Sequence, residues 1–197
     1  MLKNCLLKYY YEDFYQLCES MGGETETLMC ALLNAKADKH SISITLNSFG
    51  TPLNDPTMRE TDRKRLYPSI GDLYPAGVEQ LSKVDDDAKL MSTLSIFPLY
   101  KTIFEKLLTM SAEDFSIDDE FYKLEVKDCE LAFEGQMHLA VFYAYFKLKE
   151  QEVRNLVWIS ECIQQHMRAQ ILAFVPIFSG ASPWRCDATR KAAAATH

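Results

Sequence analysis

Several features that would indicate a particular class of protein are scarce or missing in this sequence of 197 residues. It holds only 7 glycines and 7 prolines, which excludes collagen-like and linker-like chains. Its longest apolar stretch, Met137 to Phe146, is about half of the roughly 20 residues that a helix needs to cross a bilayer. The first residues lack a secretory pattern, because Lys3 and Lys8 interrupt any apolar region. We therefore expect a soluble, cytosolic protein.

Positive charge is also in short supply. Lysine and arginine number 21 against 28 aspartates and glutamates, so the net charge is −7. An acidic protein is poorly suited to binding the phosphates of nucleic acid or an anionic membrane surface. We expect no nucleic-acid partner, and membrane association through protein partners only.

Sequence motifs for catalysis and for metal binding are absent as well. No G-x-G-x-x-G, Walker-type or G-x-S-x-G pattern occurs, and no cysteine or histidine pair has the spacing of a zinc site. The acidic runs 85–87 and 118–120 lack the calcium-loop pattern and fit the starts of helices better. His138 lies in an apolar segment, so a packed, hydrogen-bonded core histidine is favoured over a ligand. We expect no catalytic residue, metal or cofactor and, in most of the cysteines, reduced buried thiols.

The sequence does contain helical periodicity over most of its length. Apolar residues recur at steps of three and four from Leu2 to Met21, where Gly22-Gly23 predicts a stop. Thr25 is a plausible N-cap for a second helix that reaches Phe49. Within that helix, residues 41–46 alternate with the period of a strand, but the 3.5-residue spacing covers more positions and favours a helix.

The remaining elements are also predicted to be helical. Short helices are expected over 59–66, 77–83, 86–94 and 99–108, in and after a proline-rich stretch. Asp118 is a plausible N-cap for a helical region that extends to about Leu172, with a break near Gly135. The fold class is therefore all-α, a bundle of packed helices, spanning residues 1–178 as one domain. Residues 179–197 lack apolar periodicity and are expected to be a disordered tail.

The last predicted helix is amphipathic. Its apolar stripe is expected to pack on the body and comprises Val153, Leu156, Val157, Ser160, Ile163, Met167 and Ile171. The opposite, polar stripe and the residues beside it are either a contact surface for a partner or an internal polar network, and both readings stay open. This candidate set comprises Lys149, Glu150, Arg154, Asn155, Glu161, Gln165 and Arg168. Within it, Glu150 and Arg154 have the i,i+4 spacing of a helical ion pair.

Several strings in this sequence resemble the subunit d family of vacuolar-type proton ATPases, also called the C/AC39 family. They are ITLNSFGT at 44–51, LYP at 66–68 and again at 73–75, VFYAYFKLKEQEVRN at 141–155, VWISECI at 157–163 and VPIF at 175–178. The resemblance runs from the N-terminus to Phe178 and matches the C-terminal half of family members. Because packing neighbours from the other half would be missing, we expect weak stability in isolation.

That resemblance implies a non-catalytic, funnel-shaped helical-repeat subunit without a cofactor. Its implied partners are the proteolipid c-ring and the central-stalk subunits of the V-ATPase, on the cytosolic face of vacuolar, endosomal or other acidic-organelle membranes. Its implied role is to couple ATP hydrolysis to proton transport and organelle acidification. Two alternatives stay open, which are a free-standing helical adaptor that binds a partner helix, and a helical enzyme that uses His138 with nearby carboxylates.

Overall fold

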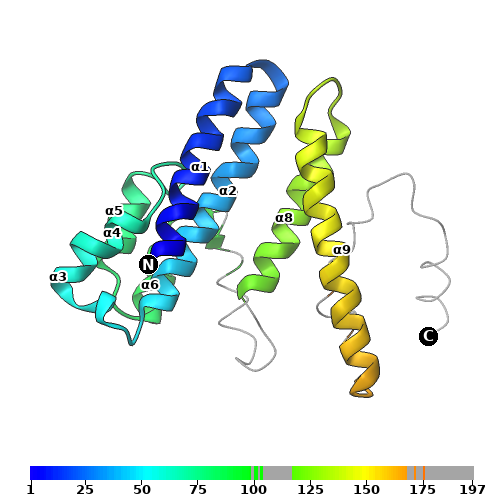
Figure 1. Ribbon diagram of the computed structural model, residues 1–197. Helices are drawn as coiled ribbons and strands as arrows, with labels where there is room; N and C mark the ends of the chain where they lie inside the picture. Colours follow the sequence, from blue (N-terminus) through cyan, green and yellow to red (C-terminus); the bar gives the residue numbers. More distant parts are fainter. Residues whose placement is uncertain (99, 102, 104–116, 168–170, 172–174, 176–197) are drawn as a thin grey trace.

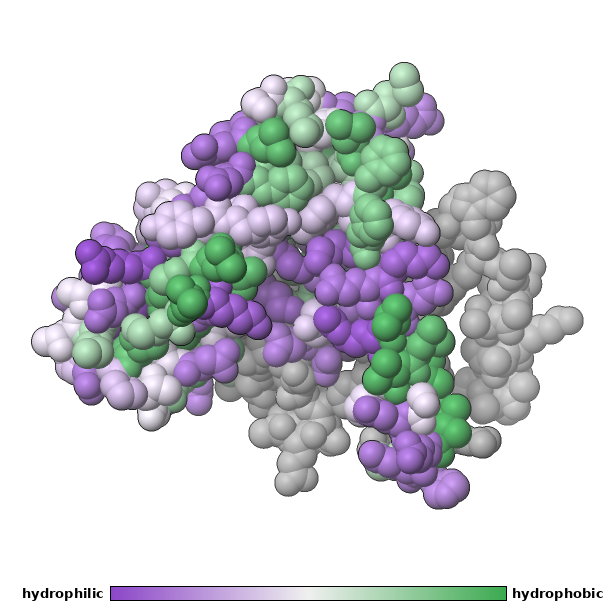
Figure 2. Space-filling view, in the orientation of Figure 1, coloured by the Kyte–Doolittle hydropathy of each residue, from purple (hydrophilic) through white to green (hydrophobic). Residues whose placement is uncertain are grey.

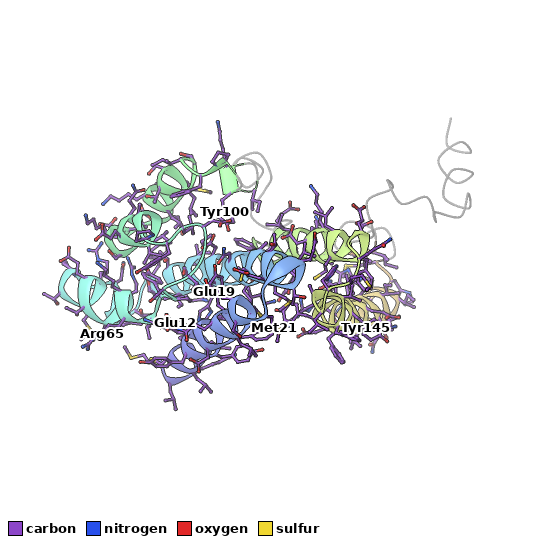
Figure 3. All side chains as sticks on the ribbon, turned by 90° about the horizontal axis from the view of Figure 1, so that it is seen from above. Glu12, Glu19, Met21, Arg65, Tyr100 and Tyr145 are labelled. Atoms are coloured by element: carbon purple, nitrogen blue, oxygen red, sulfur yellow. The ribbon has the colours of Figure 1, made fainter. Side chains whose placement is uncertain are left out.

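The computed structural model describes residues 1–98, 100–101, 103, 117–167, 171 and 175. Within these residues the secondary structure is helical, without strands, which confirms the all-α prediction. Figure 1 shows two long helical hairpins, α1–α2 and α8–α9, side by side. Seen from above, the α1–α2 hairpin lies between the α8–α9 hairpin and a layer of shorter helices, α3 to α6 (Figure 3). The predicted tail, 179–197, lies outside the described residues.

The first hairpin consists of α1 (Leu2–Met21) and α2 (Gly23–Ser48). Gly22 separates them with φ 69°, a left-handed conformation that glycine adopts without steric cost. The predicted N-cap, Thr25, is wrong, because α2 begins two residues earlier. The Thr25 hydroxyl instead accepts the backbone N–H of Leu139 at 3.1 Å, which joins this hairpin to the loop before α9.

The strand-like alternation at residues 41–46 lies within α2, as the helix prediction required. The hydroxyl of Ser41 donates to the carbonyl of Ala37 at 3.1 Å, and that of Thr45 donates to the carbonyl of Ser41 at 2.9 Å. Buried hydroxyls therefore find acceptors in the preceding turn of the same helix.

The layer of short elements follows α2. It contains η1 (Pro52–Asn54), α3 (Pro56–Met58), the π-helical turn η2 (Arg59–Arg63), α4 (Lys64–Leu66), α5 (Ala76–Lys83) and α6 (Asp87–Leu94). Asp86 caps α6 by accepting the N–H of Asp87 at 2.7 Å, so this acidic run begins a helix as predicted. The helix predicted over 99–108 falls mostly outside the described residues.

Two buried polar side chains anchor this layer to α2. Arg63 is 0% exposed, and its guanidinium donates to the hydroxyl of Ser48 at 2.8 Å. It also donates to the Asn54 side chain and to three carbonyls at the end of α5, of Leu81, Ser82 and Val84. Asp38, 1% exposed, accepts the hydroxyl of Tyr100 at 2.7 Å and the backbone N–H groups of Asp72 and Leu73.

The second hairpin consists of α8 (Ile117–Glu134) and α9 (Ala140–Gln164), with the predicted break at Gly135. Asp118 lies inside the first turn of α8, which begins at Ile117. Because an N-cap residue precedes the first helical residue, the predicted N-cap role of Asp118 is wrong. Its charge still lies at the positive end of the helix dipole, as expected for this acidic run.

The apolar core forms two clusters. One joins α2 to α5 and α6 around Ile42, Leu81 and Leu94, each 0% exposed. The other joins the two hairpins around Leu33 and Ala144. The second cluster positions α8 and α9 against α2.

The orientation of α9 is opposite to the prediction. Val153, Leu156 and Val157 are 61%, 60% and 53% exposed, and the other described members of the predicted stripe are exposed or half-buried. Apolar side chains are visible along the lower part of α9 in Figure 2. The buried positions of α9 carry small residues instead, Ala140, Ala144 and Cys162. Small side chains allow close packing of α9 in the bundle, and that close packing turns the bulkier apolar face outward.

Candidate functional site

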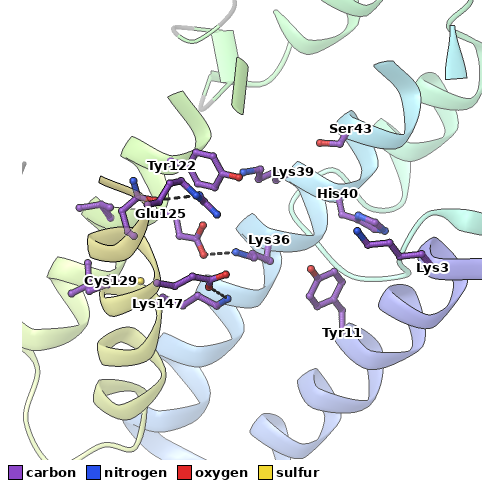
Figure 4. Close-up of a pocket in the computed structure, with 15 residues that line it drawn as sticks. Lys3, Tyr11, Lys36, Lys39, His40, Ser43, Tyr122, Glu125, Cys129 and Lys147 are labelled. Carbon is purple, nitrogen blue, oxygen red and sulfur yellow. Dashed lines mark hydrogen bonds and ion pairs between the residues drawn. The ribbon is translucent and has the colours of Figure 1, made fainter. Parts of the chain in front are cut away.

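A polar cavity of about 440 Å³ lies where α1, α2, α8 and α9 converge (Figure 4). Most of its lining side chains are charged or carry a hydrogen-bonding group. They are Lys3, Tyr11, Lys36, Lys39, His40, Ser43, Tyr122, Glu125, Val126, Cys129, Lys147, Leu148, Glu150, Gln151 and Arg154. Five are lysines or arginines and two are carboxylates, so the cavity carries excess positive charge in a chain of net charge −7.

Helical spacing brings these groups to one place. Lys36, Lys39, His40 and Ser43 follow one another on α2 at steps of three, one and three residues, which places them on a single face. Lys147, Glu150 and Arg154 follow one another on α9 at steps of three and four residues, which also places them on a single face. These two faces lie on opposite sides of the hollow, and Tyr11 and Lys3 reach it from α1 (Figure 4).

Two ion pairs involve residues that line the cavity, one between helices and one within a helix. Lys36 of α2 pairs with Glu125 of α8, which links the two hairpins directly. Lys147 pairs with Glu150 at 2.8 Å within α9. Glu150 therefore has a lysine partner, where the sequence spacing predicted Arg154.

The ring of Tyr122 attracts two cations. The ammonium nitrogen of Lys39 lies 3.6 Å from the ring centre, and the guanidinium carbon of Arg154 lies 3.7 Å from it. Lys39 is also 3.6 Å from a carboxylate oxygen of Asp118, and Arg154 donates to the Gln151 side chain at 3.3 Å. Cation–π contacts of this kind hold positive charge at the cavity wall without neutralising it.

Burial shifts the proton affinities of several lining groups. Desolvation lowers the pKa of Lys39, although Asp118 and Glu125 oppose the change. It also lowers the pKa of His40, which favours a neutral imidazole at neutral pH. Burial is the first cause, and Glu125 the second, of a raised pKa at the Tyr11 phenol.

The structure divides the candidate set predicted from the sequence. Glu150 and Arg154 line the cavity, and Asn155 is half-buried, accepting a hydrogen bond from Gln151 at 2.8 Å. The remaining described members point to solvent, and Lys149 pairs with Glu152 at 2.6 Å on the surface. They are Lys149, Glu161 and Gln165, while Arg168 lies outside the described residues.

Sequence reasoning missed the part of the site that α1, α2 and α8 contribute. Lys36, Lys39 and His40 stand on one face of α2 among buried neighbours, and that polar face was the available signal. Tyr122 and Glu125 gave no signal of their own, because their role depends on a helix distant in sequence.

His138 is buried, at 8% exposed, as expected of a core histidine. The predicted hydrogen bond is wrong, since neither ring nitrogen has a partner. Cys18, Cys129 and Cys162 are buried free thiols, in line with the prediction, whereas Cys5 and Cys30 are free but only half-buried, so the prediction of burial is wrong for these two. In the part of the chain that the structure describes, no group of three potential ligands could hold a metal ion. None of the helices in that same part is both long and apolar enough to span a membrane.

Comparison with known proteins identifies the family. The model of the ATP synthase (C/AC39) subunit family matches residues 1–174. V-type proton ATPase subunit d of Dictyostelium discoideum is 42% identical over 178 residues, which are 90% of this chain and 48% of that protein. V-type proton ATPase subunit d1 of Arabidopsis thaliana is 44% identical over 171 residues, 87% of this chain and 47% of that protein. The subunit d of Saccharomyces cerevisiae is 34% identical over 179 residues, 90% of this chain and 48% of that protein.

The chain thus spans about half the length of the curated relatives that it matches. The resemblance stated from the sequence strings is confirmed by both kinds of match. With 174 of its 197 residues covered by the family model, this chain belongs to the ATP synthase (C/AC39) subunit family.

Proposed function

We propose that this chain is a non-catalytic coupling subunit in the membrane sector of a rotary, proton-pumping V-type ATPase. In this role it links the central stalk to the proteolipid ring, so that ATP hydrolysis elsewhere in the complex drives proton transport and organelle acidification. The observation that carries the proposal is identity of 42–44% to proteins named V-type proton ATPase subunit d over about nine-tenths of the chain. The proposed location is the cytosolic face of acidic-organelle membranes, reached through protein partners.

The helical architecture supports a mechanical role. The 26 residues of α2 and the 25 of α9 correspond to rods of about 39 and 37 Å, respectively, at 1.5 Å per residue. The Lys36–Glu125 pair and the Thr25–Leu139 hydrogen bond join the two hairpins at separate points. Helices that are fixed to one another at two separate points transmit a torque with less bending than helices joined at one point.

The outward face of α9 supports the existence of a protein partner. Val153, Leu156 and Val157 lie within two turns of one another, and all three are more than half exposed. Contiguous exposed apolar surface of this kind marks interaction sites in soluble proteins.

For the polar candidate set, we propose a division of roles. Lys149, Glu161 and Gln165 belong to this contact surface. Glu150, Arg154 and Asn155 instead belong to a polar network in and beside the cavity.

Affinity capture of the tagged full chain from gently solubilised organelle membranes tests the proposal, with partners identified by mass spectrometry. We expect recovery of both proteolipid-ring and central-stalk subunits. Leu156→Asp places a charge on the proposed contact surface and should abolish capture while leaving the circular dichroism spectrum unchanged. Ile96→Asp is the matched control, because Ile96 is similarly exposed (63% against 60%) but lies next to α6.

Capture of neither ring nor stalk subunits by the folded chain would contradict the coupling role. Capture of a different protein in their place would favour the free-standing helical adaptor. Equal loss of capture in both variants would show that α9 is not the contact surface.

A further inference from the structure

We propose that the cavity between α1, α2, α8 and α9 binds a small soluble molecule that carries two or more phosphate groups. This site is independent of the proposed contact surface, which lies on the outward face of α9. It would place a metabolite-binding site within a protein whose proposed role is mechanical.

The charge balance of the cavity favours an anion. The pairs Lys36–Glu125 and Lys147–Glu150 each neutralise one lysine of the lining. Lys3 and Arg154 have no carboxylate oxygen within 4.0 Å among the residues that the structure describes. Within the described part of the chain, Lys39 pairs with the carboxylate of Asp118, whose side chain is 62% exposed and does not line the cavity. Three cations from three different helices, Lys3, Lys39 and Arg154, therefore line one hollow in excess of the two lysines that its own carboxylates pair with.

Two further polar groups in the lining, His40 and Ser43, also favour an anion. The Nε2 atom of His40 is buried without a hydrogen-bond partner, and its ring packs edge-on against Tyr11 at 5.8 Å. An anion beside this imidazole would favour its protonated form, which donates a hydrogen bond from Nε2. The hydroxyl of Ser43 lines the same wall one turn further along α2. A phosphate oxygen would thus find charged donors and the neutral Ser43 hydroxyl within one site.

The volume of the cavity indicates the size of the ligand that it can hold. About 440 Å³ lies within the roughly 300–1,000 Å³ of small-molecule sites and is far larger than a single phosphate needs. The three excess cations also call for several negative charges, which compact polyphosphorylated molecules carry. A nucleic acid is disfavoured, because its further phosphates would meet the acidic surface of a chain of net charge −7.

The charged residues of the lining provide a matched pair of test variants. Lys147 lines the cavity, whereas Lys149 lies two residues further along α9 and points to solvent. Lys147→Gln and Lys149→Gln therefore remove the same charge from the same helix on different faces. Lys39→Gln and Lys3→Gln test the sides of the cavity that α2 and α1 form. Because Lys3 is exposed, Lys3→Gln replaces Lys39→Gln in the test if that more buried variant fails to fold.

Isothermal titration calorimetry of the full chain at low ionic strength provides the measurement, with sodium tripolyphosphate as the probe. We expect saturable binding that Lys147→Gln and Lys39→Gln weaken by about tenfold each, which corresponds to about 1.4 kcal/mol. Lys149→Gln should bind as tightly as the unmodified chain. Citrate, which matches the multiple charge with carboxylates, should bind more weakly.

Four results would overturn the proposal. The first is the absence of saturable tripolyphosphate binding by the folded chain. The second is equal weakening by Lys147→Gln and Lys149→Gln, which would show general charge attraction. The third is binding of citrate as tight as that of tripolyphosphate. The fourth is flotation of the chain with vesicles that contain a bisphosphorylated phosphoinositide, in the absence of binding to soluble tripolyphosphate. The third result would assign the cavity to carboxylate ligands, and the fourth would assign it to a lipid surface.

Discussion

Replacement of Arg63 by methionine should remove the strongest polar anchor between α2 and the layer of short helices. The guanidinium donates to the Ser48 hydroxyl at 2.8 Å and to the carbonyls of Leu81 and Val84 at 2.8 and 2.6 Å. Burial lowers the pKa of this guanidinium from its ordinary value, yet arginine stays protonated in proteins. Methionine fills a similar volume but satisfies none of these acceptors.

The magnitude follows from the acceptors that the variant leaves behind. Hydrogen bonds to a charged group contribute about 1.5–3 kcal/mol each, but losses within one network do not add. Breaking a buried charged network by removing one partner costs about 3–5 kcal/mol in total. With a urea m-value of about 2 kcal/mol/M, a loss of about 4 kcal/mol lowers the midpoint by about 2 M. Ser48→Ala removes one of these bonds and should cost about 1–2 kcal/mol.

Urea unfolding followed by far-UV circular dichroism measures both effects. Arg65→Met is the control, because the Arg65 side chain is exposed and its backbone carbonyl, which the substitution keeps, is the group that accepts a hydrogen bond from Lys8. This control should stay within about 0.5 kcal/mol of the unmodified chain. An Arg63→Met midpoint equal to that of Arg65→Met would refute the assignment of Arg63 as an anchor.

Two further predictions concern the contact between α2 and residues 71–73. Burial raises the pKa of Asp38 to about 6, although hydrogen bonds from Tyr100 and Leu73 lower it, so the folded chain binds this proton more tightly than the unfolded chain does. The free energy of unfolding should therefore fall as pH rises from about 4 to about 6, by on the order of 3 kcal/mol, and level off above. Urea titrations across this range should show that loss in the unmodified chain but not in Asp38→Asn, and parallel curves for the two would contradict it. Gly71→Ala should cost more than about 2 kcal/mol, because φ is 115° and a Cβ would collide with the Asp38 carboxylate. Gly50→Ala, also at positive φ but facing open space, should cost only about 1 kcal/mol in the same thermal or urea melts, and equal losses would exclude the collision.

The long helices were predictable because their signals are local. The glycine pair after Met21 and the break at Gly135 both end helices where the sequence indicated. The ambiguous segment 41–46 was resolved by counting matches to each period over the longer window. Its serine and threonine side chains bond back within α2, and this local compensation makes a strand-like pattern compatible with a helix.

The orientation of α9 was not predictable from its amphipathicity. The helical stripe with the larger side chains was assigned to the interior, but Ala140, Ala144 and Cys162 face inward instead. Which face is buried depends on how closely the neighbouring helix can approach, and that is a property of the pair. The same reason hid the cavity and the Arg63 network, whose members are brought together by contacts between segments distant in the sequence.

The outward apolar face of α9 has a consequence for the amount of this protein in a cell. If the proposed partner covers that face, its binding stabilises the folded chain by mass action, by about 2.7 kcal/mol at a partner concentration one hundred times the dissociation constant. Losses of only 1–2 kcal/mol change the cellular abundance of a marginally stable protein several-fold, because unfolded chains are degraded. Surface substitutions such as Leu156→Asp would then lower protein levels in cells while leaving the purified chain as stable as before. The supply of the partner would set how much of this chain survives.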